Sequence, residues 1–170
     1  MENQTSNLQK AVVNGLLLSL ITILYSLLGA TIQLTGIVGI LLWIVKFGAV
    51  IYLLYYFMKK RSLEFEVYTY GNSFWFGFLT CAFATIACVA YTILQYTVIF
   101  PDALSGQLEQ AQAMMEQFGS DTSALESIDM GKIMRSVIFF GMPIYYIIWG
   151  LILPAILASS TKRNNITYEG

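Results

Sequence analysis

Residues Gly36–Arg61 have the sequence GIVGILLWIVKFGAVIYLLYYFMKKR, which contains an apolar run long enough to cross a lipid bilayer. A membrane-spanning helix needs about 20 apolar residues, and the run from 37 to 58 meets that requirement. The segment ends in the densest basic cluster of the chain, Lys59–Arg61, and it has a lysine, Lys46, near its middle. These features predict a spanning helix that places one charged side chain inside the hydrocarbon region.

Three further apolar runs flank this one, so the sequence predicts an all-α membrane protein with four transmembrane helices in a single domain, 1–170. The four predicted spans are 11–32, 37–58, 73–100 and 137–159. The first run has no charge over 22 residues. The apolar core of a cleaved signal peptide has about 7–15 residues, so we interpret this run as a retained first helix. The connection Gln33–Gly36 is short, which predicts an antiparallel hairpin of the first two helices. Pro143 and Pro154 interrupt the last span and predict kinks.

The composition excludes several classes of function. Hydrophobic residues make up 57% of the chain and charged residues 11%, whereas soluble domains have about 25% charged residues. A net charge of −1 argues against nucleic acid as a partner, because phosphate binding needs a basic face. There is no histidine, and we find no phosphate loop, metal-ligand spacing or catalytic triad. We therefore expect no catalytic residue, cofactor or metal, and the lipid bilayer is the one partner that the composition requires.

The distribution of charge predicts how the chain crosses the membrane. Six basic residues fall on the side of the termini and two on the other side. The positive-inside rule therefore places both termini in the cytoplasm. Segment 102–132, which has six acidic residues and one basic residue, becomes an extracytoplasmic loop. An apolar stripe at helical spacing predicts that this loop is helical, and it either packs on the bundle or binds a partner.

Lys46 is the best single candidate for a functional group. It lies roughly 13–14 Å from the start of its helix at 1.5 Å per residue, where a lysine costs about 2.5–3.5 kcal/mol. Counting the same depth along the other spans predicts a polar layer of hydroxyl groups that accept hydrogen bonds from the lysine. The residues of this predicted layer are Tyr25, Tyr91, Thr92, Tyr145 and Tyr146. The lysine then has three interpretations: a structural or snorkelling charge, a contact for a partner's intramembrane carboxylate, or a binding group for an anionic ligand or lipid.

Cys81 and Cys88 lie seven residues apart in the third apolar run. Two helical turns separate them by roughly 10 Å, which is too far for a disulfide. We expect both to behave as small buried hydrophobic residues and not as redox or metal-binding groups.

The entry to the third span, Tyr68–Phe78 (YTYGNSFWFGF), and its exit, Ile99–Asp102 (IFPD), resemble recurring segments of a family of small bacterial membrane proteins labelled domain of unknown function 4199. The likeness covers nearly the whole chain in layout. It implies four spans and a bacterial inner membrane, and it implies no activity, cofactor or catalytic residue.

Three classes of function remain, and we rank them. A non-enzymatic accessory or assembly subunit of a larger membrane system comes first, because the chain is small and has no catalytic motif. A small-solute or lipid transporter or binding protein that uses the intramembrane lysine comes second. A membrane-embedded enzyme comes last, since the spans have no paired carboxylates. The sequence leaves the oligomeric state, the ligand and any protein partner open.

Overall fold

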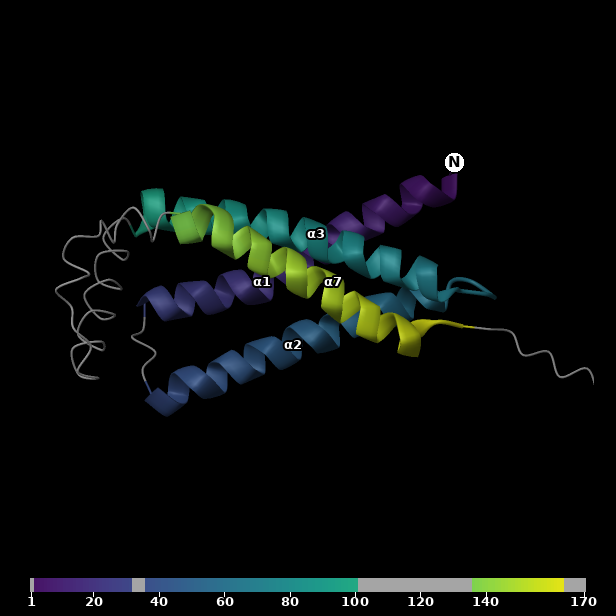
Figure 1. Cartoon of the computed structure of the whole chain (residues 1–170), viewed down its shortest axis with the longest axis horizontal. Helices are drawn as coiled ribbons and strands as arrows, with labels where there is room; N and C mark the ends of the chain where they lie inside the picture. Colours follow the sequence, from purple (N-terminus) through teal and green to yellow (C-terminus); the bar gives the residue numbers. More distant parts are fainter. Residues whose placement is uncertain (1, 32–35, 101–135, 164–170) are drawn as a thin grey trace, which may run out of the picture. The chain divides into compact units, whose positions relative to one another are not determined.

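A computed structural model describes residues 2–31, 36–100 and 136–163 of the chain. The described residues are helical apart from short turns and a single isolated β-bridge. Figure 1 shows the elements in chain order: α1 Glu2–Thr31, α2 Gly36–Ser62, α3 Tyr70–Leu94, η1 Gln95–Ile99, η2 Val137–Gly141 and α7 Met142–Thr161. Four helical stretches are long and apolar enough to cross a membrane. The predicted all-α class with four spans is confirmed, and the loop over 102–132 lies outside the described residues.

The helices extend beyond the apolar runs that predict them. Helix α1 begins at Glu2 and not at Ala11, and α2 continues to Ser62. Apolar length marks only the part of a helix that lies in hydrocarbon, whereas backbone hydrogen bonding continues into the headgroup layer. At this level Arg61 on α2 donates to the Asn7 side chain of α1 from its Nε atom, at 2.8 Å.

The chain divides into two compact units, 1–88 with 145–170 and 89–144. In the first unit, glycines let α3 approach its neighbours closely. A methyl group built on Gly15 of α1 would lie 2.6 Å from the Thr80 carbonyl oxygen of α3. One built on Gly77 of α3 would lie 2.8 Å from the Met58 sulfur of α2 and 2.9 Å from Cβ of Pro154 on α7. Small residues at such crossings are what helix packing in membranes requires.

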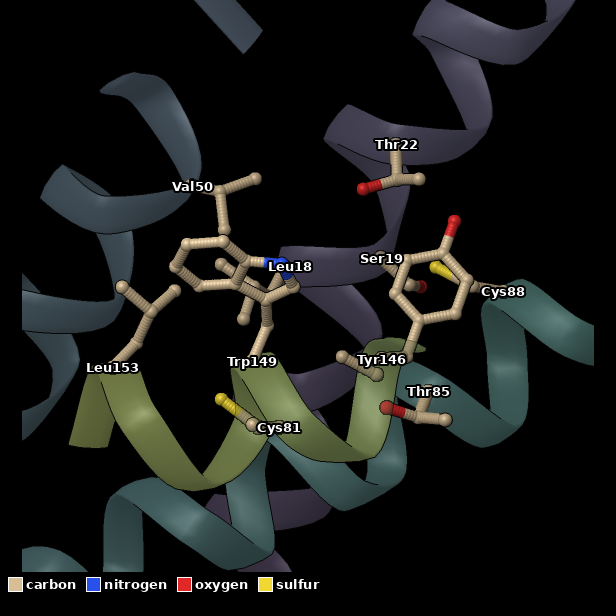
Figure 2. Close-up of a pocket in the computed structure, with 12 residues that line it drawn as sticks. Leu18, Ser19, Thr22, Val50, Cys81, Thr85, Cys88, Tyr146, Trp149 and Leu153 are labelled. Carbon is tan, nitrogen blue, oxygen red and sulfur yellow. The ribbon is translucent and has the colours of Figure 1, made fainter. Parts of the chain in front are cut away.

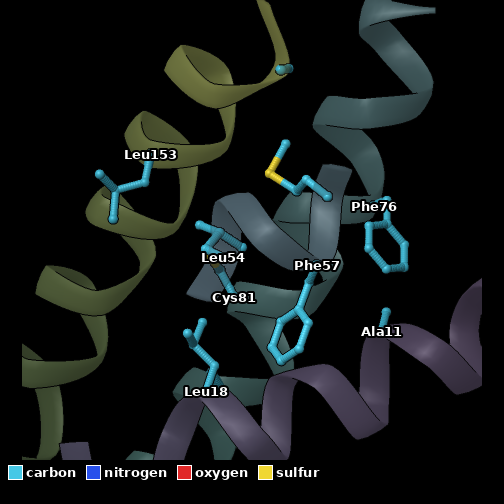
Figure 3. Packing of buried hydrophobic residues seen from close by; sticks show 10 residues of the cluster. Ala11, Leu18, Leu54, Phe57, Phe76, Cys81 and Leu153 are labelled. Carbon is cyan, nitrogen blue, oxygen red and sulfur yellow. The ribbon is translucent and has the colours of Figure 1, made fainter. Parts of the chain in front are cut away.

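The buried core of the first unit joins side chains from all four spans (Figure 3). Its members are Ala11, Leu18, Leu54, Phe57, Met58, Phe76, Cys81, Ala84, Leu153 and Ala158. Cys81 and Cys88 are both buried and neither forms a disulfide, as the sequence predicts. Leu54, Met58 and Ala158 are fully buried.

Polar contacts connect the ends of the four helices on one side of the first unit. The Lys10 ammonium nitrogen lies 2.6 Å from a carboxylate oxygen of Glu64, which connects the start of α1 to the end of α2. The Ser73 and Thr161 hydroxyl oxygens lie 2.5 Å apart and connect the start of α3 to the end of α7. We call this the termini end, because the first turns of α1 and the last turn of α7 contribute to it. The four spans therefore alternate in direction, which includes the predicted hairpin of α1 and α2.

An antiparallel backbone bridge completes the termini end. The Tyr68 N–H donates to the Arg163 carbonyl and the Arg163 N–H donates to the Tyr68 carbonyl, both at 2.8 Å. The Arg163 guanidinium also donates to the Phe65 carbonyl at 3.3 Å. These bonds join the segment between α2 and α3 to the segment that follows α7.

The 89–144 unit contains two π-helical turns, each separated by one residue from a proline that follows it. In η2 the Met142 N–H donates to the Val137 carbonyl, five residues back. Pro143 has no N–H to offer the Phe139 carbonyl, so a wider turn here accommodates the missing hydrogen bond. The structure therefore has a π-turn just before Pro143, where the sequence predicts a kink. In η1 the Phe100 N–H donates to the Gln95 carbonyl at 2.8 Å, and Pro101 follows in the sequence.

Candidate intramembrane polar site

Lys46 lies on α2 with its side chain turned toward α1. Its ammonium nitrogen is 4.6 Å from the centroid of the Tyr25 ring. A cation over an aromatic face gains about 0.5–2 kcal/mol, most where water is excluded, which offsets part of the cost of placing a lysine in hydrocarbon. The sequence predicts a hydrogen bond from Lys46 to the Tyr25 hydroxyl group. The structure instead places the ammonium over the Tyr25 ring as a cation–π contact.

A pocket of about 80 Å³ lies between the four helices of the first unit. Lys46 does not line it, but one of the lining residues, Cys88, interacts electrostatically with the lysine. Figure 2 shows that its lining divides into two parts. Thr22, Cys88 and Tyr146 form a polar end, and the Cys88 thiol and the Thr22 side chain are hydrogen-bond partners. The opposite end is apolar, and its largest side chains are Leu18, Val50, Trp149 and Leu153.

Helical spacing places Lys46 one turn from residues that line the pocket. Tyr25 follows Thr22 by three residues on α1, and Lys46 precedes Val50 by four on α2, so each pair shares a helix face. The lysine over Tyr25 is then one turn from the pocket wall on both helices. The Lys46 ammonium is also close enough to Cys88 of α3 for an electrostatic interaction.

The structure brings together three of the residues that the sequence singled out and two that it did not. Lys46, Tyr25 and Tyr146 contribute to the site or its immediate border. Thr22 and Cys88 are additions. Thr22 has a signal in the sequence, since it lies one turn before Tyr25 on the same face. Cys88 has none, because a cysteine in an apolar run is ordinarily a core residue.

Tyr145 belongs to the first unit and is not among the residues that line the pocket. The Tyr145 side chain is 48% exposed, and its ring packs edge-on against Tyr146 and Trp149 at centroid distances of 5.6 and 6.3 Å. Adjacent positions on a helix differ by about 100°, so only one of the two tyrosines faces the pocket. Tyr91 and Thr92 belong to the 89–144 unit, and both are half-buried.

The site offers a cation, a thiol and hydroxyl groups. Within residues 2–31, 36–100 and 136–163, both ion pairs involve Glu64, and no carboxylate pairs with Lys46. The same residues contain no group of three or more side chains that could hold a metal ion. An ammonium group in a membrane interior without a carboxylate is suited to binding an anionic oxygen.

A second polar cluster lies at the termini end, around Arg61. The Arg61 side chain is only 5% exposed. Its guanidinium donates to the Asn7 side chain and to the Glu64 carboxylate, and it lies 4.8 Å from the centroid of the Phe65 ring. The arginine at the end of the basic cluster is therefore buried and paired, and it holds α1 against α2.

The electrostatics of this cluster follow from its contacts. Partial burial acts to raise the pKa of Glu64, but hydrogen bonds from Lys10 and Arg61 outweigh that effect and hold the pKa below its ordinary value. Burial raises the pKa of Tyr68 to about 12; the Arg61 charge opposes the rise and the Glu64 charge adds to it. The Tyr68 hydroxyl donates to the Asn72 carbonyl at 3.2 Å.

Four helices that are long and apolar enough to cross a membrane are typical of a small polytopic membrane protein. The chain belongs to the family described as protein of unknown function (DUF4199), whose model matches residues 10–163. This match confirms the resemblance stated from the sequence. No curated protein and no solved structure matches the chain.

Proposed function

We propose that this protein is a non-enzymatic accessory or assembly subunit of a larger membrane system, and that it docks to a partner membrane protein through the first half of α2. The observation on which this proposal rests is the unusual exposure of α2. Only 6% of its most apolar stretch is buried, compared with 28% for the third span. Apolar exposure alone is no signal in a bilayer, because lipid tails are as apolar as leucine. The difference in burial between α2 and the third span is therefore the observation that supports a docking surface on α2.

The exposed surface covers most of the helix circumference. At 100° per residue its side chains span roughly 220°, and the half-buried Gly39, Leu42 and Lys46 occupy the remaining arc. We call it the α2 arc. Its members are Ile37, Val38, Ile40, Leu41, Trp43, Ile44 and Val45. A helix with so few internal neighbours gains most from packing against a further helix, since van der Waals contact drives helix association in membranes.

Site-specific photo-crosslinking tests this proposal. A benzophenone amino acid at Ile40 or Val45 should crosslink to one and the same membrane protein in native membranes, and that protein should co-purify stoichiometrically with the untagged chain. Ile86 on α3 is the matched control, because it is 63% exposed compared with 65% for Val45. The proposal fails if the α2 positions crosslink only to lipid or to the same set of proteins as Ile86. A crosslink to a second copy of this chain would show that the α2 arc mediates self-association and not docking to a different protein.

The pocket at Lys46 supports a second candidate function, the binding of a small anionic ligand or lipid. A cation next to a pocket with one polar and one apolar end fits a molecule with an anionic group and a short apolar part. Mass spectrometry of the protein purified in mild detergent tests this candidate. A bound species that is present in the wild type and in Lys46→Arg, and absent from Lys46→Met, would support it. Identical bound species in Lys46→Met and the wild type would exclude it.

A further inference from the structure

The last turns of α2 form a groove that is distinct from both the Lys46 pocket and the α2 arc. It has a volume of about 270 Å³ and is lined by Tyr52, Tyr55, Tyr56, Lys59, Lys60 and Leu63. These positions recur at intervals of three and four residues, so they share one face of the helix. Tyr52 is 69% exposed and Leu63 60% exposed, which shows that this face is turned away from the interior of the first unit.

Neither lysine of the groove is paired with an acidic residue in segments 2–31, 36–100 and 136–163. Glu64, the nearest acidic residue in the sequence, is bound by Lys10 and by Arg61. Arg61 points into the first unit, whereas Lys59 and Lys60 line the groove. Within the part of the chain that the structure describes, neither lysine ammonium makes an ion pair. The end of α2 therefore has two adjacent cations for which the described residues provide no counterion.

The groove has the length and polarity of a phospholipid at the membrane surface. From Tyr52 to Lys60 the helix rises roughly 12 Å at 1.5 Å per residue. The lysines lie at the level of the headgroups, where long basic side chains extend toward water. The tyrosines descend from that level along the start of the acyl chains, with their rings available for apolar contact and their hydroxyl groups for hydrogen bonds to the glycerol region.

We propose that this groove is a binding site for an anionic phospholipid of the leaflet at the termini end, with Lys59 and Lys60 on the phosphate and Tyr52, Tyr55 and Tyr56 along the glycerol and upper acyl chain. Charge complementarity selects an anionic lipid over a zwitterionic one, because basic residues directly beside a spanning helix attract anionic headgroups. A free phosphate ion would contact the lysines and leave the tyrosine part of the groove unfilled.

Native mass spectrometry with an equimolar mixture of phosphatidylglycerol and phosphatidylethanolamine tests the site. The wild type should retain phosphatidylglycerol in preference. Lys59→Gln with Lys60→Gln should reduce that preference roughly tenfold or more, since each basic residue near the surface contributes about 1 kcal/mol. Lys162→Gln with Arg163→Gln is the matched control. It removes the same charge from the termini end and leaves the groove and the backbone bridge of Arg163 in place, so the preference should persist.

Further outcomes keep the proposal testable if the double glutamine variant does not fold. Lys59→Arg with Lys60→Arg should retain the preference, because it keeps both charges. A photoactivatable phosphatidylglycerol should label the wild type within residues 52–63. The proposal is overturned if the wild type shows no preference, if both double glutamine variants lose it equally, or if labelling falls elsewhere. Displacement of the lipid by millimolar inorganic phosphate would also overturn it, because the site would then bind phosphate without the lipid.

Discussion

The ammonium nitrogen of Lys46 lies 4.6 Å from the centre of the Tyr25 ring, so the cation is in contact with an aromatic face. Replacing Lys46 with methionine keeps most of the stem volume and removes an insertion cost of about 2.5–3.5 kcal/mol, while the lost cation–π contact is worth about 0.5–2 kcal/mol. We expect Lys46→Met to be as stable as the wild type or more stable in thermal unfolding in detergent.

Tyr25 provides the control for this prediction. Tyr25→Phe keeps the aromatic face and should be close to neutral. Tyr25→Leu should destabilise the wild-type protein and have little effect in the Lys46→Met background. A double-mutant cycle that shows no coupling between positions 25 and 46 would contradict the assigned contact.

Gly15 and Gly48 form a matched pair for the packing of the first unit. A Cβ on Gly15 would lie 2.6 Å from the Thr80 carbonyl oxygen and 2.8 Å from Cβ of Phe83, so Gly15→Ala must push α1 away from α3. We expect a loss of about 1–3 kcal/mol from overpacking. A Cβ on Gly48 would have no atom within 4 Å, so Gly48→Ala should gain about 0.5–1 kcal/mol from helix propensity. Thermal unfolding of both variants checks the pair, and equal effects would argue against the α1–α3 crossing.

Lys46 shows which features of the site can be predicted from the sequence. Counting residues from the helix ends gives depth in the membrane, and depth alone is enough to pair Lys46 with Tyr25. Depth does not give rotation about the helix axis, which is why the predicted layer includes Tyr145 although its side chain is 48% exposed. From the sequence, Cys88 is predicted to be a core residue and nothing more. Its partners Thr22 and Lys46 lie on other helices, and spacing along one helix cannot locate them.

Arg61 shows a second limit. In the sequence it is the last residue of a basic cluster, and such clusters ordinarily face water. In the structure its side chain is 5% exposed, because Asn7 and Glu64 both accept its hydrogen bonds. Glu64 lies three residues away and could be anticipated from helical spacing. Asn7 is 54 residues away, and only the packing of α1 on α2 makes it a neighbour.

Membrane sidedness remains a prediction from the count of basic residues, and the structure improves the choice of probe positions. Ser62 is buried and donates to the Lys59 carbonyl at 2.9 Å, so a cysteine there would resist labelling for reasons unrelated to topology. Val67 is 53% exposed at the same end, is not part of the lipid groove, and is the better position. Val67→Cys should be protected from an impermeant thiol reagent in sealed cells, and Ser105→Cys should react. The two native cysteines are buried, and the unmodified chain is the background control. Reaction at position 67 in intact cells would reverse the orientation.

The last prediction concerns the pH dependence of the Glu64 cluster. The pKa of Glu64 lies below its ordinary value of 4.5 because of its hydrogen bonds from Lys10 and Arg61. A carboxylate with a depressed pKa in the folded state stabilises the fold fully above the unfolded pKa, and the stabilisation is lost as the pH falls through the folded pKa. We therefore expect stability to decline below about pH 4.5 and Glu64→Gln to lower stability at neutral pH while flattening that decline. Glu66→Gln is the matched control, because among the described residues Glu66 has no ion-pair partner, and it should leave both the stability and its pH dependence unchanged. A decline in Glu64→Gln as steep as that of the wild type would show that another carboxylate controls the acid limit, and that the Arg61 cluster does not stabilise the contact between α1 and α2 through its charge.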